Sequence, residues 1–243
     1  MDKLIYTAMS GAKATMSQQT SVAHNLANAT TTGFRAELHR FRAVNVQTPA
    51  LPTRAFAVDA SVSNDLSTGP LERTSAPYDV AINGNGWFVV QGADGKEAYT
   101  RNGHFTIDPE GVLRTTSGLA VMGDGGPITI PPDNSIEVGQ DGTITTTPLT
   151  GAKTSASAIA RFKLVNPAAA DLVRGEDGLF RTQTPAAQDD SVRVSGGYLE
   201  GSNVNVVDQI VSMMSLARQF EMQIKMLDTA QQDDKAATAI ISR

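Results

Sequence analysis

The placement of proline and glycine constrains the fold of this chain more than any other feature. All 11 prolines lie between Pro49 and Pro185, and every glycine except Gly11 and Gly33 lies between Gly69 and Gly201. Helix interiors exclude proline and disfavour glycine, whereas short strands need both residues at their turns. The pattern therefore predicts an α+β chain, with long terminal helices flanking a central β domain.

Two terminal segments have helical periodicity. The first predicted helix runs from about Asp2 to Ala27, with small or apolar residues at helical spacing and an almost uncharged polar face that indicates partial burial. The last begins near Val206, where Asn205 can cap it, and carries an unbroken heptad stripe to Leu227. Thirty-odd residues at ~1.5 Å each give a helix of ~50 Å, which overhangs a central domain of ~14 Å radius. The stripe must then meet another long helix.

That partner helix can be intramolecular or intermolecular. An antiparallel pair within one molecule would close a single fold. Coiled-coil-like packing between molecules is favoured because both helices are terminal and the polar face of the first is uncharged. Both alternatives stay open at the level of the sequence.

The centre predicts short, mostly antiparallel strands in a sandwich or irregular barrel, because turn signals recur every few residues. Hairpins are expected around four glycine-containing turns, at residues 83–86, 92–95, 108–111 and 123–126, and a further turn at 140–142 leads into a strand. The predicted organisation is an N-terminal assembly helix and turn motif (1–34), a connector (35–65), the central β domain (66–200) and a C-terminal assembly helix (201–243).

The composition excludes several kinds of chemistry. The chain has no cysteine, a formal net charge of -5 and no apolar run of the ~20 residues that a membrane span needs. We therefore expect no thiolate chemistry, nucleic-acid binding or membrane insertion, and the start lacks the long apolar segment of a cleaved signal peptide. The three histidines, His24, His39 and His104, have no metal-ligand spacing, and the Asp-Gly pairs are expected to be turns. We predict no cofactor, no metal and no enzymatic activity.

Four motifs resemble those of bacterial flagellar basal-body rod and hook proteins. The first is Asn-Leu-Ala-Asn-Ala-Thr-Thr-Thr-Gly-Phe-Arg at residues 25–35, where the Asn and Thr side chains can satisfy backbone groups at the helix end and Gly33 allows a turn with positive φ. The others lie at residues 71–88, 99–105 and 199–205. The family often has Asn or Asp where this chain has Thr30, and Ala where it has Gly201.

The resemblance implies a structural subunit of the flagellar rod, with the opening segment most similar to the proximal-rod members. Such subunits pass through the flagellar type III export apparatus without a cleaved signal and assemble with other rod proteins in the periplasm. Their terminal helices line the axial tube, which transmits torque and continues the export channel. A distal-rod subunit, a β-domain binding module with an oligomerising coiled coil, and an enzyme with a site in the β domain are the alternatives.

The mechanism that follows is folding coupled to assembly. We expect the segments up to about Thr32 and beyond about Val206 to order on meeting neighbouring helices, so that Ala217→Asp would abolish incorporation. The predicted assembly interface comprises Ile5, Ala8, Ala12, Met16, Leu26, Asn28, Gly33, Phe34, Val206, Ile210, Met213, Ala217, Phe220, Ile224 and Leu227.

Overall fold

The computed structural model describes residues 2–45, 55–132, 134–148 and 156–241, which form two compact units. The helical unit comprises Met1–Ala29, Ala36–Asp65 and Val204–Arg243, and the β unit comprises Thr30–Arg35 and Leu66–Asn203. The α+β class is confirmed. The fourfold division predicted from the sequence stays a prediction, and residues 46–54 of the predicted connector lie outside the described residues.

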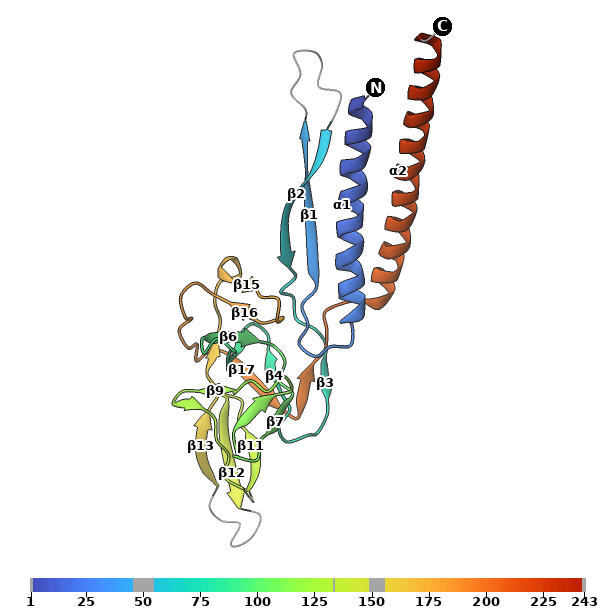
Figure 1. The fold of residues 1–243 in the computed structure, drawn as a ribbon. Coiled ribbons are helices and arrows are strands. Elements are labelled where there is room, and N and C mark those ends of the chain that lie inside the picture. The colour runs from blue at the N-terminus through green and yellow to red at the C-terminus, as the bar shows by residue number, and fades with distance from the viewer. Residues whose placement is uncertain (1, 46–54, 133, 149–155, 242–243) are drawn as a thin grey trace. The chain divides into compact units, whose positions relative to one another are not determined.

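Two long helices form the helical unit, and their bounds agree with the prediction. Helix α1 spans Asp2–Ala27 and helix α2 spans Val206–Ile241. They contact each other and run in opposite directions (Figure 1). The structure thus contains the intramolecular antiparallel pair that the sequence left open, while coiled-coil packing is not confirmed. Neither helix, in its described residues, is long and apolar enough to cross a membrane.

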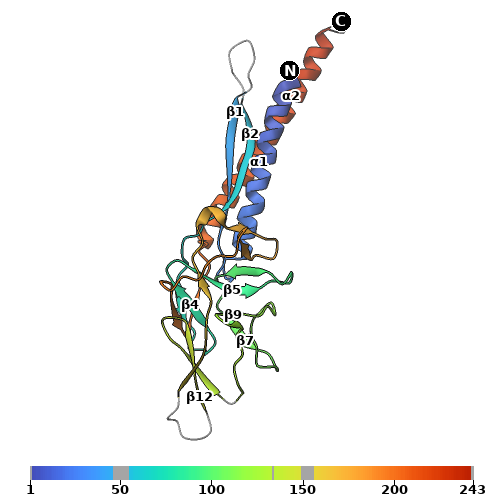
Figure 2. The same cartoon turned by 90° about the vertical axis from the view of Figure 1, so that its left-hand side faces the viewer.

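A β-hairpin accompanies α1, where the sequence predicted only a connector. Strands β1 (Glu37–Asn45) and β2 (Ala55–Asn64) pair antiparallel, with a register shift between Arg40 and Phe41. Both strands contact α1, and the ribbon lies along that helix in both views (Figures 1 and 2). The backbone N–H of Asp65 donates to the carbonyl of Ala36 at 2.8 Å and closes the base of the hairpin.

The β unit is built from short antiparallel strands in several small sheets. The largest has the order β14-β5-β6-β16-β15, and a second has the order β11-β12-β13. Four two-stranded pairs complete the unit, namely β17-β4, β18-β3, β7-β8 and β10-β9. A sandwich or barrel is not confirmed. The strands are β3 (Leu71–Arg73), β4 (Val80–Asn83), β5 (Trp87–Gln91), β6 (Glu97–Thr100), β7 (Phe105–Ile107), β8 (Leu113–Thr115), β9 (Met122–Gly123), β10 (Gly126–Pro127), β11 (Asn134–Val138), β12 (Thr143–Pro148), β13 (Ser157–Arg161), β14 (Leu164–Val165), β15 (Val173–Arg174), β16 (Phe180–Arg181), β17 (Arg193–Gly196) and β18 (Tyr198–Glu200).

Strand β5 is buried on both faces and divides the hydrophobic core in two. Phe88 packs into the larger cluster, where its ring centroid lies 5.3 Å from that of Phe105 and 5.6 Å from that of Phe162. Trp87 points to the smaller cluster and lies 4.6 Å from Phe180. Neighbouring residues of a strand point to opposite faces of the sheet. Because both faces of β5 are buried, its sequence is a continuous apolar run instead of an alternating pattern.

One predicted hairpin is wrong and three are confirmed. The turn at residues 83–86 does not join paired strands, because β4 pairs with β17 and β5 pairs with β6 and β14. Strand β4 is buried on both faces, because Val80, Ala81 and Ile82 are all buried. A two-stranded hairpin exposed on one face could not bury consecutive residues in this way. Arg101 donates to the carbonyl of Gly84 and anchors this turn from a different strand end. The turns at 92–95, 108–111 and 123–126 do connect paired strands, β5-β6, β7-β8 and β9-β10, and the turn at 140–142 connects β11 to β12.

Candidate assembly interface

The motif at residues 25–35 ends α1 and leads the chain away from it. Asn25 is buried and pairs with the backbone of Glu37 twice, accepting from its N–H at 2.8 Å and donating to its carbonyl at 2.9 Å. The side chain of Asn28 donates to the carbonyl of His24 at 2.9 Å, within the last turn of the helix. Asn28 thus satisfies a carbonyl of the helix end, as expected, whereas Asn25 binds the first residue of β1.

Gly33 has the positive φ that the motif predicts. Its φ is +69°, and its N–H donates to the carbonyl of Glu200 at 2.8 Å. A Cβ at this position would lie 2.4 Å from the backbone nitrogen of Asn102, so the backbone segments meet without room for a side chain. The turn is therefore part of the β unit and holds the incoming chain against residues 101–102.

Arg35, Arg101 and Glu200 form a buried charged cluster in the β unit. Their side chains are at most 2% exposed, and Glu200 lies 2.8 Å from Nη1 of Arg35 and 3.3 Å from Nε of Arg101. The backbone N–H of Gly69 donates to the same carboxylate at 2.9 Å. Burial lowers the pKa of Arg101 to about 10, an effect that the Glu200 charge opposes and the Arg35 charge reinforces.

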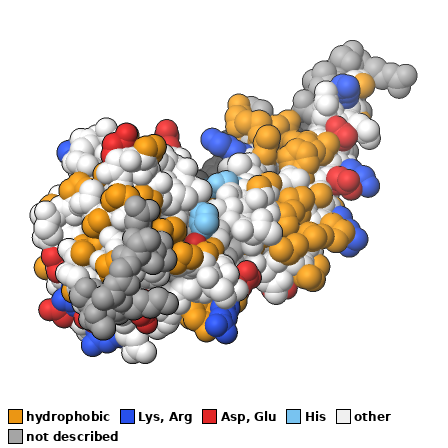
Figure 3. All heavy atoms as spheres, turned by 90° about the horizontal axis from the view of Figure 1, so that it is seen from below, with side chains coloured by type: hydrophobic (Ala, Val, Ile, Leu, Met, Phe, Trp, Pro, Cys, Tyr) orange, Lys and Arg blue, Asp and Glu red, His pale blue; other side chains and the backbone are white. Residues whose placement is uncertain are grey.

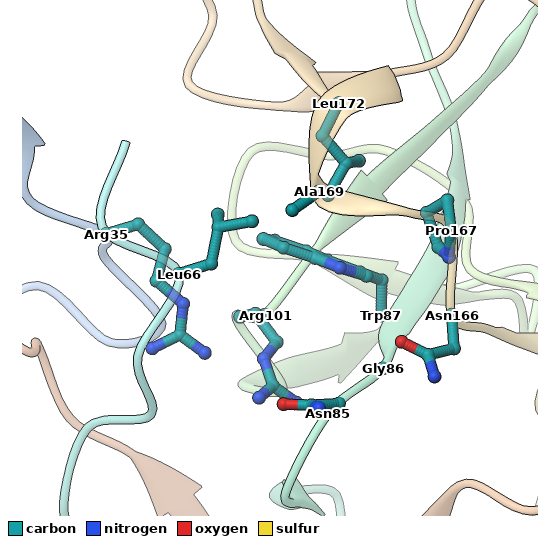
Figure 4. Close-up of a pocket in the computed structure, with 10 residues that line it drawn as sticks. All are labelled: Arg35, Leu66, Asn85, Gly86, Trp87, Arg101, Asn166, Pro167, Ala169 and Leu172. Carbon is teal, nitrogen blue, oxygen red and sulfur yellow. The ribbon is translucent and has the colours of Figure 1, made fainter. Parts of the chain in front are cut away.

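Trp87 completes this cluster. The guanidinium carbons of Arg35 and Arg101 lie 6.0 and 5.8 Å from the centroid of its ring, within cation–π range. A cavity of about 220 Å³ surrounds the indole (Figure 4). The two guanidinium groups on its lining are already engaged with Glu200 and with the carbonyls of Ser67 and Gly84. The arrangement is suited to holding chain segments together, since removal of one partner from a buried ion pair costs about 3–5 kcal/mol.

A small and a polar residue of α1, Gly11 and Thr15, lie close to Gln223 of α2. Ala8, Ala12 and Thr15 are buried, and the hydroxyl of Thr15 lies 3.3 Å from Oε1 of Gln223 on α2. A Cβ at Gly11 would approach Gln223 Nε2 to 3.1 Å, so the two helices are close at this point. Small side chains permit this approach, but they cover little of the α2 surface.

Helix α2 consequently exposes a row of hydrophobic side chains. Val207 is 67% exposed, Val211 58% and Met214 50%, all in its first half. On α1, Tyr6 and Met9 are each 56% exposed. Figure 3 shows hydrophobic side chains gathered along the helical part of the chain, bordered by charged residues. Monomeric proteins rarely expose contiguous apolar rows, and such rows mark interaction surfaces.

The predicted interface residues are distributed over both units. Gly33 and Phe34 belong to the β unit, where the Phe34 ring lies 4.7 Å beneath the Arg174 guanidinium. The others belong to the helical unit. Ala8, Ala12 and Phe34 are buried; Ile5, Leu26, Asn28, Gly33, Met213, Ala217, Phe220 and Leu227 are half-buried; Met16, Val206, Ile210 and Ile224 are exposed.

The Asp-Gly pairs at residues 94, 141 and 177 are turns. In each, the Asp carboxylate accepts from a backbone N–H two residues ahead, that of Lys96, Thr143 or Leu179. No three His, Asp or Glu side chains lie together as a metal site in the described part of the chain.

The chain has two long terminal helices with exposed hydrophobic side chains, and the buried charges of its β unit bind one another. Both features are typical of a structural assembly subunit. Comparison with known proteins agrees. Three family descriptions match: "Flagella basal body rod protein" at residues 5–35, "Flagellar hook protein FlgE/F/G D1 domain" at 81–146 and "Flagellar basal body rod FlgEFG protein C-terminal" at 195–240.

Relatives match over almost the whole chain. The chain is 42% identical to the flagellar basal-body rod protein FlgF of Salmonella typhimurium over 250 residues, which cover 100% of this chain and 99% of the relative. It is 43% identical to FlgF of Escherichia coli, covering 98% and 97%. A rod protein FlgG of Buchnera aphidicola is 30% identical, covering 94% and 95%. The chain therefore belongs to the family of flagellar basal-body rod proteins, and it is a structural rod subunit rather than an enzyme.

The buried charged cluster was missed by the sequence reasoning. Glu200 and Arg101 each stand inside a recognised motif, but no local pattern indicates that they meet Arg35. The signal that the sequence offered was that Arg101 and Glu200 are charged residues in motifs made mostly of turn and apolar residues.

Proposed function

We propose that this chain is a subunit of the proximal part of the flagellar rod and assembles with other rod proteins through its two terminal helices. The observation that carries the proposal is the hydrophobic row on α2, with Val207, Val211 and Met214 at least half exposed. The identity of 42–43% to FlgF proteins supports the place in the rod.

On this proposal the chain reaches the periplasm through the flagellar type III export apparatus, without a cleaved signal peptide. The assembled helices transmit torque and continue the export channel. The absence of cysteine suits passage from a reducing to an oxidising compartment, because no thiol can form an unwanted disulfide on the way.

Val211→Asp is a sharper test of the interface than Ala217→Asp. Ala217 is half-buried in the monomer, so a charge there would also disturb the packing of the monomer itself. Val211 is 58% exposed, and an Asp there costs the monomer little. In an assembled bundle the uncompensated carboxylate would be buried at a cost of several kcal/mol, which lowers the affinity of incorporation at least about a hundredfold.

The assay is restoration of motility, and recovery of the protein in purified basal bodies, in a strain lacking its own copy of the gene. We expect Val211→Asp to fold and be exported but to be missing from basal bodies. Gln219→Asp, at an exposed polar position of the same helix, is the matched control and should incorporate normally. Normal incorporation of Val211→Asp would refute the proposed interface.

A further inference from the structure

Glu200 connects four segments that are distant in the sequence. Its carboxylate binds Arg35, Arg101 and the N–H of Gly69, and its backbone carbonyl accepts from the N–H of Gly33. Residues 30–35, here called the N-terminal linker, follow α1, and residues 200–203, the C-terminal linker, precede α2. One buried residue therefore touches the N-terminal linker and begins the C-terminal one.

The two linkers are also bound to each other and to a common third segment. The N–H of Asn203 donates to the carbonyl of Phe34 at 3.4 Å, and its side chain donates to the carbonyl of Ser67 at 3.1 Å. Nη1 of Arg35 donates to the same Ser67 carbonyl at 2.7 Å. Residues 67–70 therefore hold both linkers at once.

The backbones of residues 67–70 and of the C-terminal linker are in direct contact. The N–H of Gly201 donates to the carbonyl of Pro70 at 2.8 Å, and a Cβ at Gly69 would lie 2.1 Å from the Gly201 carbonyl oxygen. Because backbone meets backbone here, a shift of one linker cannot be absorbed by side-chain movement.

The charges make the three segments depend on one another. Two guanidinium groups share one carboxylate, and all three side chains are buried, at most 2% exposed. Without the C-terminal linker, Arg35 and Arg101 would face each other with no anion. Without the N-terminal linker, Glu200 would lose its closest cation. Uncompensated buried charges are strongly destabilising.

We propose that Glu200 is the positioning residue of a latch, formed with Arg35 and Arg101, that orders both linkers in a single cooperative step. The β unit then holds the attachments of both terminal helices or of neither. A consequence, which rests on the proposed function, is that a chain cut within either linker cannot present its remaining helix on a correctly folded β unit.

Amide hydrogen exchange in the full-length chain tests the latch. Arg35→Met removes a contact of the N-terminal linker and touches neither Gly201 nor its acceptor Pro70. We expect exchange of the Gly201 N–H to accelerate at least tenfold, together with that of Gly33, while the Val80 N–H, bonded to the carbonyl of Gly103, stays protected. Glu200→Gln should accelerate both linker amides as well.

Matched controls lie on β3, where Glu72 and Arg73 are exposed and pair with Leu199 and Tyr198. Glu72→Gln and Arg73→Met make the same chemical changes next to the latch and should leave both amides unchanged. Arg35→Lys keeps the charge but not the forked geometry, and it decides the matter if Arg35→Met unfolds the β unit. This substitution should accelerate hydrogen exchange of the Gly33 and Gly201 N–H groups by the same factor. Acceleration confined to Gly33, with Gly201 within twofold of its original rate, would overturn the latch, whereas failure of the rod interface would leave this result untouched.

Discussion

Substitution of Gly33 separates two costs that are usually combined in a turn glycine. Gly33 and Gly84 have nearly the same backbone conformation, with φ of +69° and +79°. A Cβ at Gly84 meets nothing within 4 Å, whereas at Gly33 it would lie 2.4 Å from the nitrogen of Asn102. An alanine in the left-handed region costs about 1–2 kcal/mol at either site, partly offset by a stiffer unfolded chain.

At Gly33 the linker must also move, because the clashing atoms are backbone and cannot rotate away. The movement breaks the bond from the Gly33 N–H to the carbonyl of the buried Glu200 and leaves that carbonyl unpaired, which costs about 1–3 kcal/mol. We therefore expect Gly33→Ala to be less stable than Gly84→Ala by about 1–3 kcal/mol.

Urea unfolding followed by fluorescence measures this difference directly, since Trp87 is the single tryptophan and lies in the β unit. Gly84→Ala is the control for the backbone conformation alone. Equal free energies of unfolding for the two variants, within about 0.5 kcal/mol, would show that the close approach at residues 101–102 does not constrain the linker.

Three further outcomes are expected. Phe162→Ala removes a ring from the aromatic cluster with Phe88 and Phe105 and should lower the free energy of unfolding by about 3–5 kcal/mol, measured in urea. The hydrogen bond from Arg181 lowers the pKa of Asp177, so this carboxylate stabilises the fold above its unfolded pKa of about 3.9 and the contribution is lost as the pH falls through the lower folded value. Asp177→Asn should therefore flatten the fall in stability below about pH 4, as thermal melts over a pH series would show. Asn205→Ala removes the acceptor for the Val207 N–H at 3.0 Å and should cost α2 about 1 kcal/mol, measured as faster exchange of that amide.

The helices were predictable because their signals are local. Proline is excluded from both terminal segments, and Asn205 marks the start of α2 through its own side chain. The three confirmed hairpins were also local, since each turn lies between strands that pair with each other. At residues 83–86 the same turn chemistry reverses the chain, but the partner of β4 is β17, more than a hundred residues later. A turn signal does not specify which strand will cover a buried one.

The hairpin β1-β2 had a readable signal that was not used. Phe56, Val58 and Val62 recur with a period of two in the sequence of β2. The latch had no such signal. Arg35, Arg101 and Glu200 are 66 and 99 residues apart, from 101 − 35 and 200 − 101, and only the folded chain brings their charges together. Periodicity describes the faces of elements, whereas a buried ion pair depends on how elements from distant parts of the chain meet.

The antiparallel pair and intermolecular packing, which the sequence left as alternatives, are compatible in this structure. Helix α1 approaches α2 at Gly11 and Thr15, which lie next to Gln223, and residues of this size allow a close approach but shield only a narrow strip of the opposite helix. Hydrophobic residues on α2 extend well outside that strip, from the half-buried Phe220 round to the exposed Val211. One partner of small residues cannot cover so wide an arc, because an isolated helix pair buries a single face of each helix. The monomer thus resembles an incomplete helical bundle, and on the proposed function the uncovered face of α2 is the hydrophobic area that a neighbouring subunit would cover.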